Sequence, residues 1–99
     1  MAHRVAPTAE LDLDDIWHRV AKESQSIEVA DRLIEAITNR FFLLASFPHL
    51  GRSRIVDLGV GSRSFVFGGY VIVYAGEGDD VIILRVAHGR RDVAALFLH

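Results

Sequence analysis

The fold is decided by residues 68–86, which read GGYVIVYAGEGDDVIILRV. Two apolar runs, Tyr70 to Ala75 and Val81 to Val86, are rich in β-branched and aromatic residues and are separated by glycines and acidic residues. This pattern predicts two antiparallel strands joined by a hairpin connection. Because both runs are apolar at consecutive positions, we expect each strand to be covered on both faces.

The predicted sheet extends upstream from this hairpin. Gly68-Gly69 is a two-residue loop that accepts the positive φ of a primed turn, so Ser64 to Phe67 is predicted to be the preceding strand. A further apolar run, Ile55 to Leu58, ends at a glycine-rich break and predicts another strand. The C-terminal half is therefore expected to form an antiparallel meander.

The N-terminal half follows a helical period instead. Thr8 is predicted to cap a first helix, whose apolar stripe contains Trp17, and Ser26 is predicted to cap a second. The second helix should end near Ser46, because Pro48 disfavours helical geometry in the residue before it. The apolar residues of the second helix recur at steps of three and four: Ala30, Leu33, Ile34, Ile37, Phe41 and Leu44.

The two ends of the chain complete the predicted fold. His3 to Ala6 is predicted to be a short strand that ends at Pro7, and Arg91 to Leu98 has the composition of a short helix. The sequence thus predicts an α+β fold in one domain, residues 1–99. An N-terminal helical hairpin packs on one face of a small antiparallel β-sheet, made of the N-terminal strand and the meander, with a short C-terminal helix.

Composition suggests a binding partner. Of the 99 residues 51% are hydrophobic, and the mean hydropathy of +0.25 indicates more apolar surface than one small core readily hides. The absence of cysteine excludes disulfides and thiolate chemistry and is typical of a reducing compartment, so a cytoplasmic protein is expected. The apolar runs are far shorter than the roughly 20 residues that span a bilayer, so no membrane role is expected.

The charge is small overall but unevenly distributed. A net charge of −2 gives no general basic field for binding nucleic acid. Residues 1–48 carry a balance of −3 and residues 49–99 one of +1, and almost all cations are arginines. The meander could gather several cationic residues near one end of the sheet, namely Arg63, Arg85, His88, Arg90 and Arg91. The alternative is a set of independent surface salt bridges, such as Arg90 or Arg91 with Asp92 or Asp57.

Other chemistry has little support in the sequence. The five histidines lie far apart and none pairs with another at zinc-binding spacing, so neither a metal nor a cofactor is expected. Gly59 and Gly61 lack the spacing and the following helix of a phosphate-binding loop. Ser62 and Ser64 have no nucleophile-elbow motif.

Four ordered segments carry a resemblance to a known family. They are Pro48-His49-Leu50-Gly51-Arg52, Leu58-Gly59-Val60-Gly61-Ser62-Arg63-Ser64-Phe65, Tyr70-Val71-Ile72-Val73-Tyr74 and Ile83-Leu84-Arg85-Val86-Ala87-His88-Gly89-Arg90-Arg91-Asp92. With Ala9 to Trp17 as the first helix, the chain resembles ParE toxins of the ParE/RelE superfamily over nearly its whole length.

The resemblance implies the toxin of a type II toxin–antitoxin module, neutralised by a ParD-like antitoxin that folds onto it. Such a partner, expected to be acidic and partly disordered, would cover the excess apolar surface. The candidate antitoxin contacts are Trp17, Phe65, Val73 and Ile83.

The superfamily divides into two mechanisms, and the resemblance favours one of them. ParE-type members are similar to inhibitors that trap DNA gyrase on broken DNA without being hydrolytic, which would make the cationic set above the target contacts and leave no catalytic residue. RelE-type members cleave messenger RNA on the ribosome, and here such a site would use His88, Arg85 and Arg63. Val71 and Gly89 stand where those ribonucleases often have arginine and tyrosine, which disfavours cleavage.

Two further alternatives stay open. The chain could be a non-toxic family member that only binds. The same cations could also be structural, tying the last strand to the terminal helix. No direct sequence-specific binding of nucleic acid by the toxin alone is expected.

Overall fold

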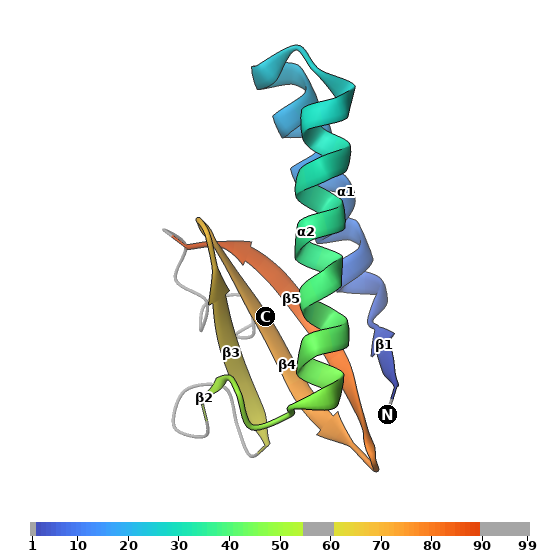
Figure 1. The fold of residues 1–99 in the computed structure, drawn as a ribbon, viewed down its shortest axis with the longest axis vertical. Coiled ribbons are helices and arrows are strands. Elements are labelled where there is room, and N and C mark those ends of the chain that lie inside the picture. The colour runs from blue at the N-terminus through green and yellow to red at the C-terminus, as the bar shows by residue number, and fades with distance from the viewer. Residues whose placement is uncertain (1, 55–60, 90–99) are drawn as a thin grey trace.

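The structure is a computed structural model that describes residues 2–54 and 61–89. Two helices, α1 (Pro7–Ser24) and α2 (Ile27–Ser46), form a hairpin that lies against one face of a five-stranded sheet (Figure 1). The strands are β1 (His3–Val5), β2 (Arg52–Ser53), β3 (Ser62–Phe67), β4 (Tyr70–Glu77) and β5 (Asp80–His88), in the spatial order β1-β5-β4-β3-β2. The predicted α+β fold class is confirmed.

The meander is antiparallel as predicted, but the sheet as a whole is mixed. β3 pairs with β4 and β4 with β5 in antiparallel register, with Gly68 at a φ of +59° in the first of the two connections. β1 joins the edge of β5 in parallel, with His3 opposite Val81. Two strands joined by a hairpin must pair antiparallel. Since two helices and three described strands separate β1 from β5 in the chain, this constraint does not apply to them, and parallel pairing is possible.

One predicted helix cap is confirmed and the other is wrong. The Ser26 side chain accepts a hydrogen bond from the Val29 N–H at 3.2 Å, and α2 ends at Ser46 as expected. Thr8 does not cap α1, because Pro7 already occupies the first helical position and Ala6 is the N-cap residue. Thr8 instead donates its hydroxyl to the Leu84 carbonyl of β5 at 3.0 Å.

The apolar core lies on both faces of the central strands. On the helix side, Ile37, Phe41 and Leu44 of α2 belong to one cluster with Ile72, Tyr74 and Ile83 of the sheet. The alternate residues of β4 and β5 form a second buried cluster, made of Val71, Val73 and Ala87.

This burial corrects two of the predicted antitoxin contacts. Val73 and Ile83 are fully buried, because strand alternation directs each into one of these clusters. Neither side chain has surface that a partner could touch on this fold.

Parts of the prediction lie outside the described residues. These are the strand expected at Ile55 to Leu58, the helix expected at Arg91 to Leu98, and the side chains of Arg90 and Arg91. Among the described residues, neither helix is long and apolar enough to cross a membrane.

Candidate functional site

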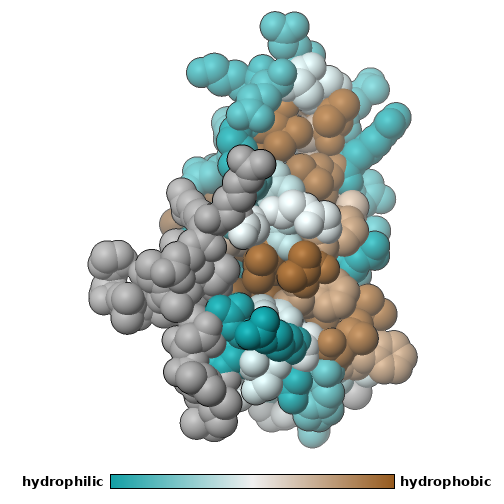
Figure 2. Space-filling model, turned by 90° about the vertical axis from the view of Figure 1, so that its left-hand side faces the viewer, coloured by the Kyte–Doolittle hydropathy of each residue, from teal (hydrophilic) through white to brown (hydrophobic). Residues whose placement is uncertain are grey.

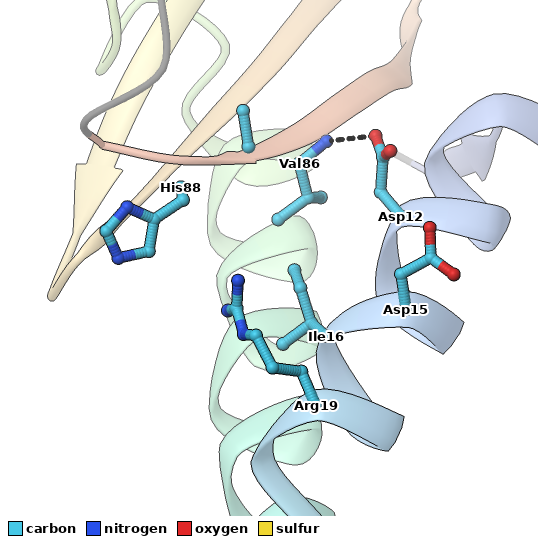
Figure 3. Close-up of a pocket in the computed structure, with 7 residues that line it drawn as sticks. Asp12, Asp15, Ile16, Arg19, Val86 and His88 are labelled. Atoms are coloured by element: carbon cyan, nitrogen blue, oxygen red, sulfur yellow. Dashed lines mark hydrogen bonds between the residues drawn. The ribbon is translucent and has the colours of Figure 1, made fainter. Parts of the chain in front are cut away.

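Beyond the end of β1, Ala6 and the first turns of α1 hydrogen-bond to the backbone of β5. The Ala6 N–H donates to the Ile83 carbonyl at 2.8 Å, and the Thr8 hydroxyl follows one residue further along the strand. One turn later the Asp12 carboxylate accepts the Val86 N–H at 2.9 Å (Figure 3). The backbone edge of β5 is thus paired with helix groups, which leaves fewer of its polar groups open to another strand.

The same carboxylate holds Arg85. The Arg85 Nε and Nη2 atoms donate to the two oxygens of Asp12 at 2.7 and 3.0 Å, and the side chains of Arg85 and Asp12 are only 19% and 13% exposed. The hydrogen bond to Asp12 raises the pKa of Arg85 above its usual value. Arg85, predicted as a target contact, therefore fastens the last strand to α1.

Beyond this ion pair, a crevice of about 150 Å³ separates α1 from the end of β5 (Figure 3). Arg19 of α1 donates from Nη2 to the Tyr70 hydroxyl at 2.9 Å, and its guanidinium carbon lies 6.0 Å from the centre of that ring. The Tyr70 ring meets the His88 imidazole edge-on, with 5.7 Å between the ring centres. The crevice is lined by Asp12, Asp15, Ile16, Arg19, Val86, Ala87 and His88.

Arg19, Tyr70 and His88 form a cluster with its own chemistry, to which α1, β4 and β5 each contribute one residue. The Tyr70 hydroxyl accepts from Arg19 and keeps its own hydrogen to donate, while the guanidinium retains further N–H donors. Together with an imidazole, such groups can bind an oxyanion and transfer a proton. Within the described residues, no group of three His, Cys, Asp or Glu side chains is placed to hold a metal ion.

Only His88 of this cluster was predicted. The pairing of Tyr70 with His88 follows from the hairpin register, in which the two residues lie directly opposite, so the sequence held a signal for Tyr70. Arg19 comes from a helix 51 positions away from Tyr70, and no local pattern indicates that contact.

Arg63 lies elsewhere, on β3, toward the edge of the sheet that is remote from α1. Its Nη1 donates to the Gly51 carbonyl at 2.7 Å. The buried Tyr74 hydroxyl binds the same loop: it accepts the Gly51 N–H and donates to the Pro48 carbonyl, both at 2.8 Å. Burial raises the pKa of Tyr74 above its usual value.

These contacts correct the predicted gathering of cations. Arg63 reaches the loop before β2 and Arg85 reaches α1, so the two guanidinium groups extend toward opposite edges of the sheet. Arg63, Arg85 and His88 therefore do not assemble into one site. Each cation is held by separate partners, because side-chain direction and strand position place them apart.

The two remaining predicted antitoxin contacts are partly exposed. Trp17 donates from Nε1 to the Asp31 carboxylate at 2.7 Å and lines a shallow groove between α1 and α2. Phe65 is half-buried on β3. The Trp17 groove is also lined by Glu10, Leu13, Asp14 and Ile34.

Comparison with known proteins gives consistent matches. The family model "ParE toxin of type II toxin-antitoxin system, parDE" matches residues 4–93. Toxin ParE3 of Caulobacter vibrioides (strain ATCC 19089 / CIP 103742 / CB 15) is 38% identical over 84 residues, which cover 85% of this chain and 82% of that protein.

A solved structure matches the fold. A chain of the structure titled "Chromosomal ParDE TA system from P. aeruginosa" superposes with a TM-score of 0.75 at 20% sequence identity. The match covers 89% of this chain and 95% of that one. Together, the family model, the sequence relative and this fold show that the chain belongs to the ParE toxin family of type II toxin–antitoxin systems.

Proposed function

We propose that this protein inhibits bacterial growth in the cytoplasm by poisoning DNA gyrase, and that a cognate ParD-like antitoxin neutralises it. The observation that carries the proposal is the family match over residues 4–93, together with the 38% identity to Toxin ParE3. The structural relative comes from a chromosomal ParDE system, which supports an antitoxin as the partner.

The contacts of the arginines support inhibition by binding rather than by hydrolysis. A ribonuclease built on His88, Arg85 and Arg63 would need these groups around one phosphate. Arg85 is instead bound by both oxygens of Asp12, and Arg63 by the Gly51 carbonyl. Within the described residues, His88 at the mouth of the α1–β5 crevice is the predicted target contact best placed to meet another molecule.

Controlled expression tests the proposal. The chain is induced in a bacterial host with and without the antitoxin encoded by the neighbouring gene, while growth and double-strand DNA breaks are measured. We expect growth arrest with accumulating breaks, and recovery of both when the antitoxin is co-expressed. Normal growth with abundant soluble protein would contradict the proposal and would favour a binding-only family member.

The Arg19–Tyr70–His88 cluster favours a second candidate function, ribosome-dependent cleavage of messenger RNA. A phenol, an imidazole and a guanidinium meet there, and these are groups that can supply a proton and stabilise a phosphoryl transition state. Primer extension on translated messages from induced cells tests it, with the Tyr70→Phe variant as the matched control. Cuts that disappear in Y70F would establish this function, and intact messages would exclude it.

A further inference from the structure

The α1–β5 crevice is lined by a cation without a carboxylate of its own. Arg19 is exposed, and its Nη2 donates to the Tyr70 hydroxyl. Among the residues that the structure describes, no carboxylate lies within ion-pair distance of the Arg19 guanidinium. Arg4 and Arg85, by contrast, each bind a carboxylate through two N–H groups. Because a guanidinium has five N–H donors, most of those of Arg19 are left for another acceptor.

The carboxylates of the crevice oppose an anion less than their number suggests. Both oxygens of Asp12 accept hydrogen bonds, from Arg85 and from the β5 backbone, and its charge is balanced by Arg85. Asp15 also lines the crevice, but Figure 3 shows its carboxylate extending toward the Asp12 side, whereas the Arg19 guanidinium extends toward the His88 side. The side of the crevice at Arg19 is therefore positively charged.

Tyr70 and His88 add donors beside this guanidinium. The two residues lie directly opposite each other on β4 and β5, and their rings meet edge-on. The Tyr70 hydroxyl accepts from Arg19 and keeps its own hydrogen to donate, and an imidazole carries at least one N–H. Since the three groups come from three different elements, they can surround a tetrahedral oxyanion.

The size and polarity of the crevice favour one small anionic group. Its volume of about 150 Å³ is below the roughly 300–1,000 Å³ of pockets that hold drug-sized ligands. Four of its seven lining residues are charged or ionisable. Figure 2, which faces the side of the molecule where β3 lies, instead shows hydrophobic residues gathered across the middle of that side. The crevice therefore offers polar recognition that this neighbouring side does not.

We propose that the α1–β5 crevice is an oxyanion site that takes one phosphate group, bound by Arg19, Tyr70 and His88. Charge-assisted hydrogen bonds from the guanidinium supply most of the affinity, and the phenol and the imidazole orient the group. The inference rests on the proposed function only for the source of the phosphate, because DNA held by gyrase and translated messenger RNA both present backbone phosphates. Such a contact carries no sequence information. Free phosphate is the other source.

An NMR titration of the purified full-length protein tests the site. Sodium phosphate is added at constant pH and ionic strength, while the imidazole resonances of His88 and the side-chain N–H resonances of Arg19 are followed. Sodium acetate is titrated in the same way, which separates a phosphate site from a carboxylate site. We expect phosphate to shift both sets of resonances to saturation and acetate to leave them nearly unchanged.

Substitutions assign the affinity to individual groups. Arg19→Gln should weaken phosphate binding by about tenfold, and Tyr70→Phe, which removes one neutral donor, by about threefold. Arg32→Gln is the matched control, because Arg32 is an exposed cation on α2 outside the crevice, and it should change the affinity by less than about twofold. Asp15→Asn should tighten binding by about twofold, because it removes the opposing charge, an effect that a purely structural role would not produce.

A short single-stranded oligonucleotide separates the two sources of phosphate. We expect it to shift the same resonances and to compete with inorganic phosphate, and we expect the same sequence with uncharged methylphosphonate linkages to do neither. Shifts with inorganic phosphate but none with the oligonucleotide would make free phosphate the ligand and overturn the nucleic-acid source.

Three results would overturn the site itself. They are the absence of a saturable shift with phosphate, equal affinity for acetate, and equal affinity of R19Q and R32Q when circular dichroism shows both variants to be folded. The proposed function fails separately. Phosphate binding that R19Q weakens, in a protein that neither stops growth nor inhibits gyrase, would keep the site and contradict the proposed function. Growth arrest and gyrase inhibition by a protein that binds no phosphate would contradict only the site.

Discussion

Replacing Asp12 by alanine should destabilise the fold strongly, because the Asp12 carboxylate ties α1 to β5. The change removes both hydrogen bonds to the Arg85 guanidinium, at 2.7 and 3.0 Å, and the 2.9 Å bond from the Val86 N–H. Fully buried pairs broken in this way cost roughly 3–5 kcal/mol. Since Arg85 and Asp12 keep 19% and 13% exposure, water compensates in part, and we expect a loss of about 3 kcal/mol.

Urea unfolding followed by circular dichroism measures this loss. A drop of about 3 kcal/mol in a domain of this size lowers Tm by roughly 12–24 °C. Asp12→Asn should lose less than D12A, because an amide oxygen can still accept the Val86 N–H while the charge pairing with Arg85 is gone.

Asp15 provides the control for this prediction. It lines the same crevice on the same helix but is exposed, so Asp15→Ala should change the unfolding free energy by no more than about 0.5 kcal/mol. If D12A lost less than about 1 kcal/mol, or as little as D15A, the assignment of Arg85 to a structural role would be refuted.

Three further substitutions probe the fold at separate points. Tyr74→Phe should cost about 2 kcal/mol in urea unfolding, because the buried Gly51 N–H loses its acceptor, and an unchanged midpoint would contradict the loop anchoring. Gln25 has a φ of 55°, so Gln25→Gly should raise the unfolding free energy by about 0.5–1 kcal/mol, whereas a loss would speak against backbone strain there. Burial lowers the pKa of His3 from its usual 6.5, so the unfolded chain binds the proton more readily and stability falls as the pH drops below that value. Urea midpoints at about pH 7.5 and about pH 5.5 should differ less in His3→Phe than in the unmodified protein, and an equal difference would rule out His3 as a cause.

The predictable part of the fold is the part encoded by neighbouring residues. Gly68-Gly69, the Ser26 cap and the end of α2 at Ser46 follow from local conformational preference, and the structure has all three. The prediction that Val73 and Ile83 contact the antitoxin is wrong, because both side chains are buried. Apolar composition alone does not show which residues of a strand the protein's own core covers.

The contacts that define the candidate site are the less predictable part. Asp12 and Arg85 meet across 73 positions, and Arg19 meets Tyr70 across 51. Such contacts depend on how α1 lies along β5, which hydrophobic periodicity does not specify. The parallel pairing of β1 has the same origin, since a short strand can join an edge in either direction.

The central claim is that this ParE family protein acts on DNA gyrase, and a supercoiling assay with purified components tests it most directly. Relaxed plasmid, gyrase and ATP are incubated with increasing amounts of the protein, and supercoiled and cleaved DNA are quantified on the same gel. We expect supercoiling to decline and cleaved DNA to accumulate, and both effects to disappear when the antitoxin is added. Undiminished supercoiling at a large excess of folded protein, without cleaved DNA, would contradict it.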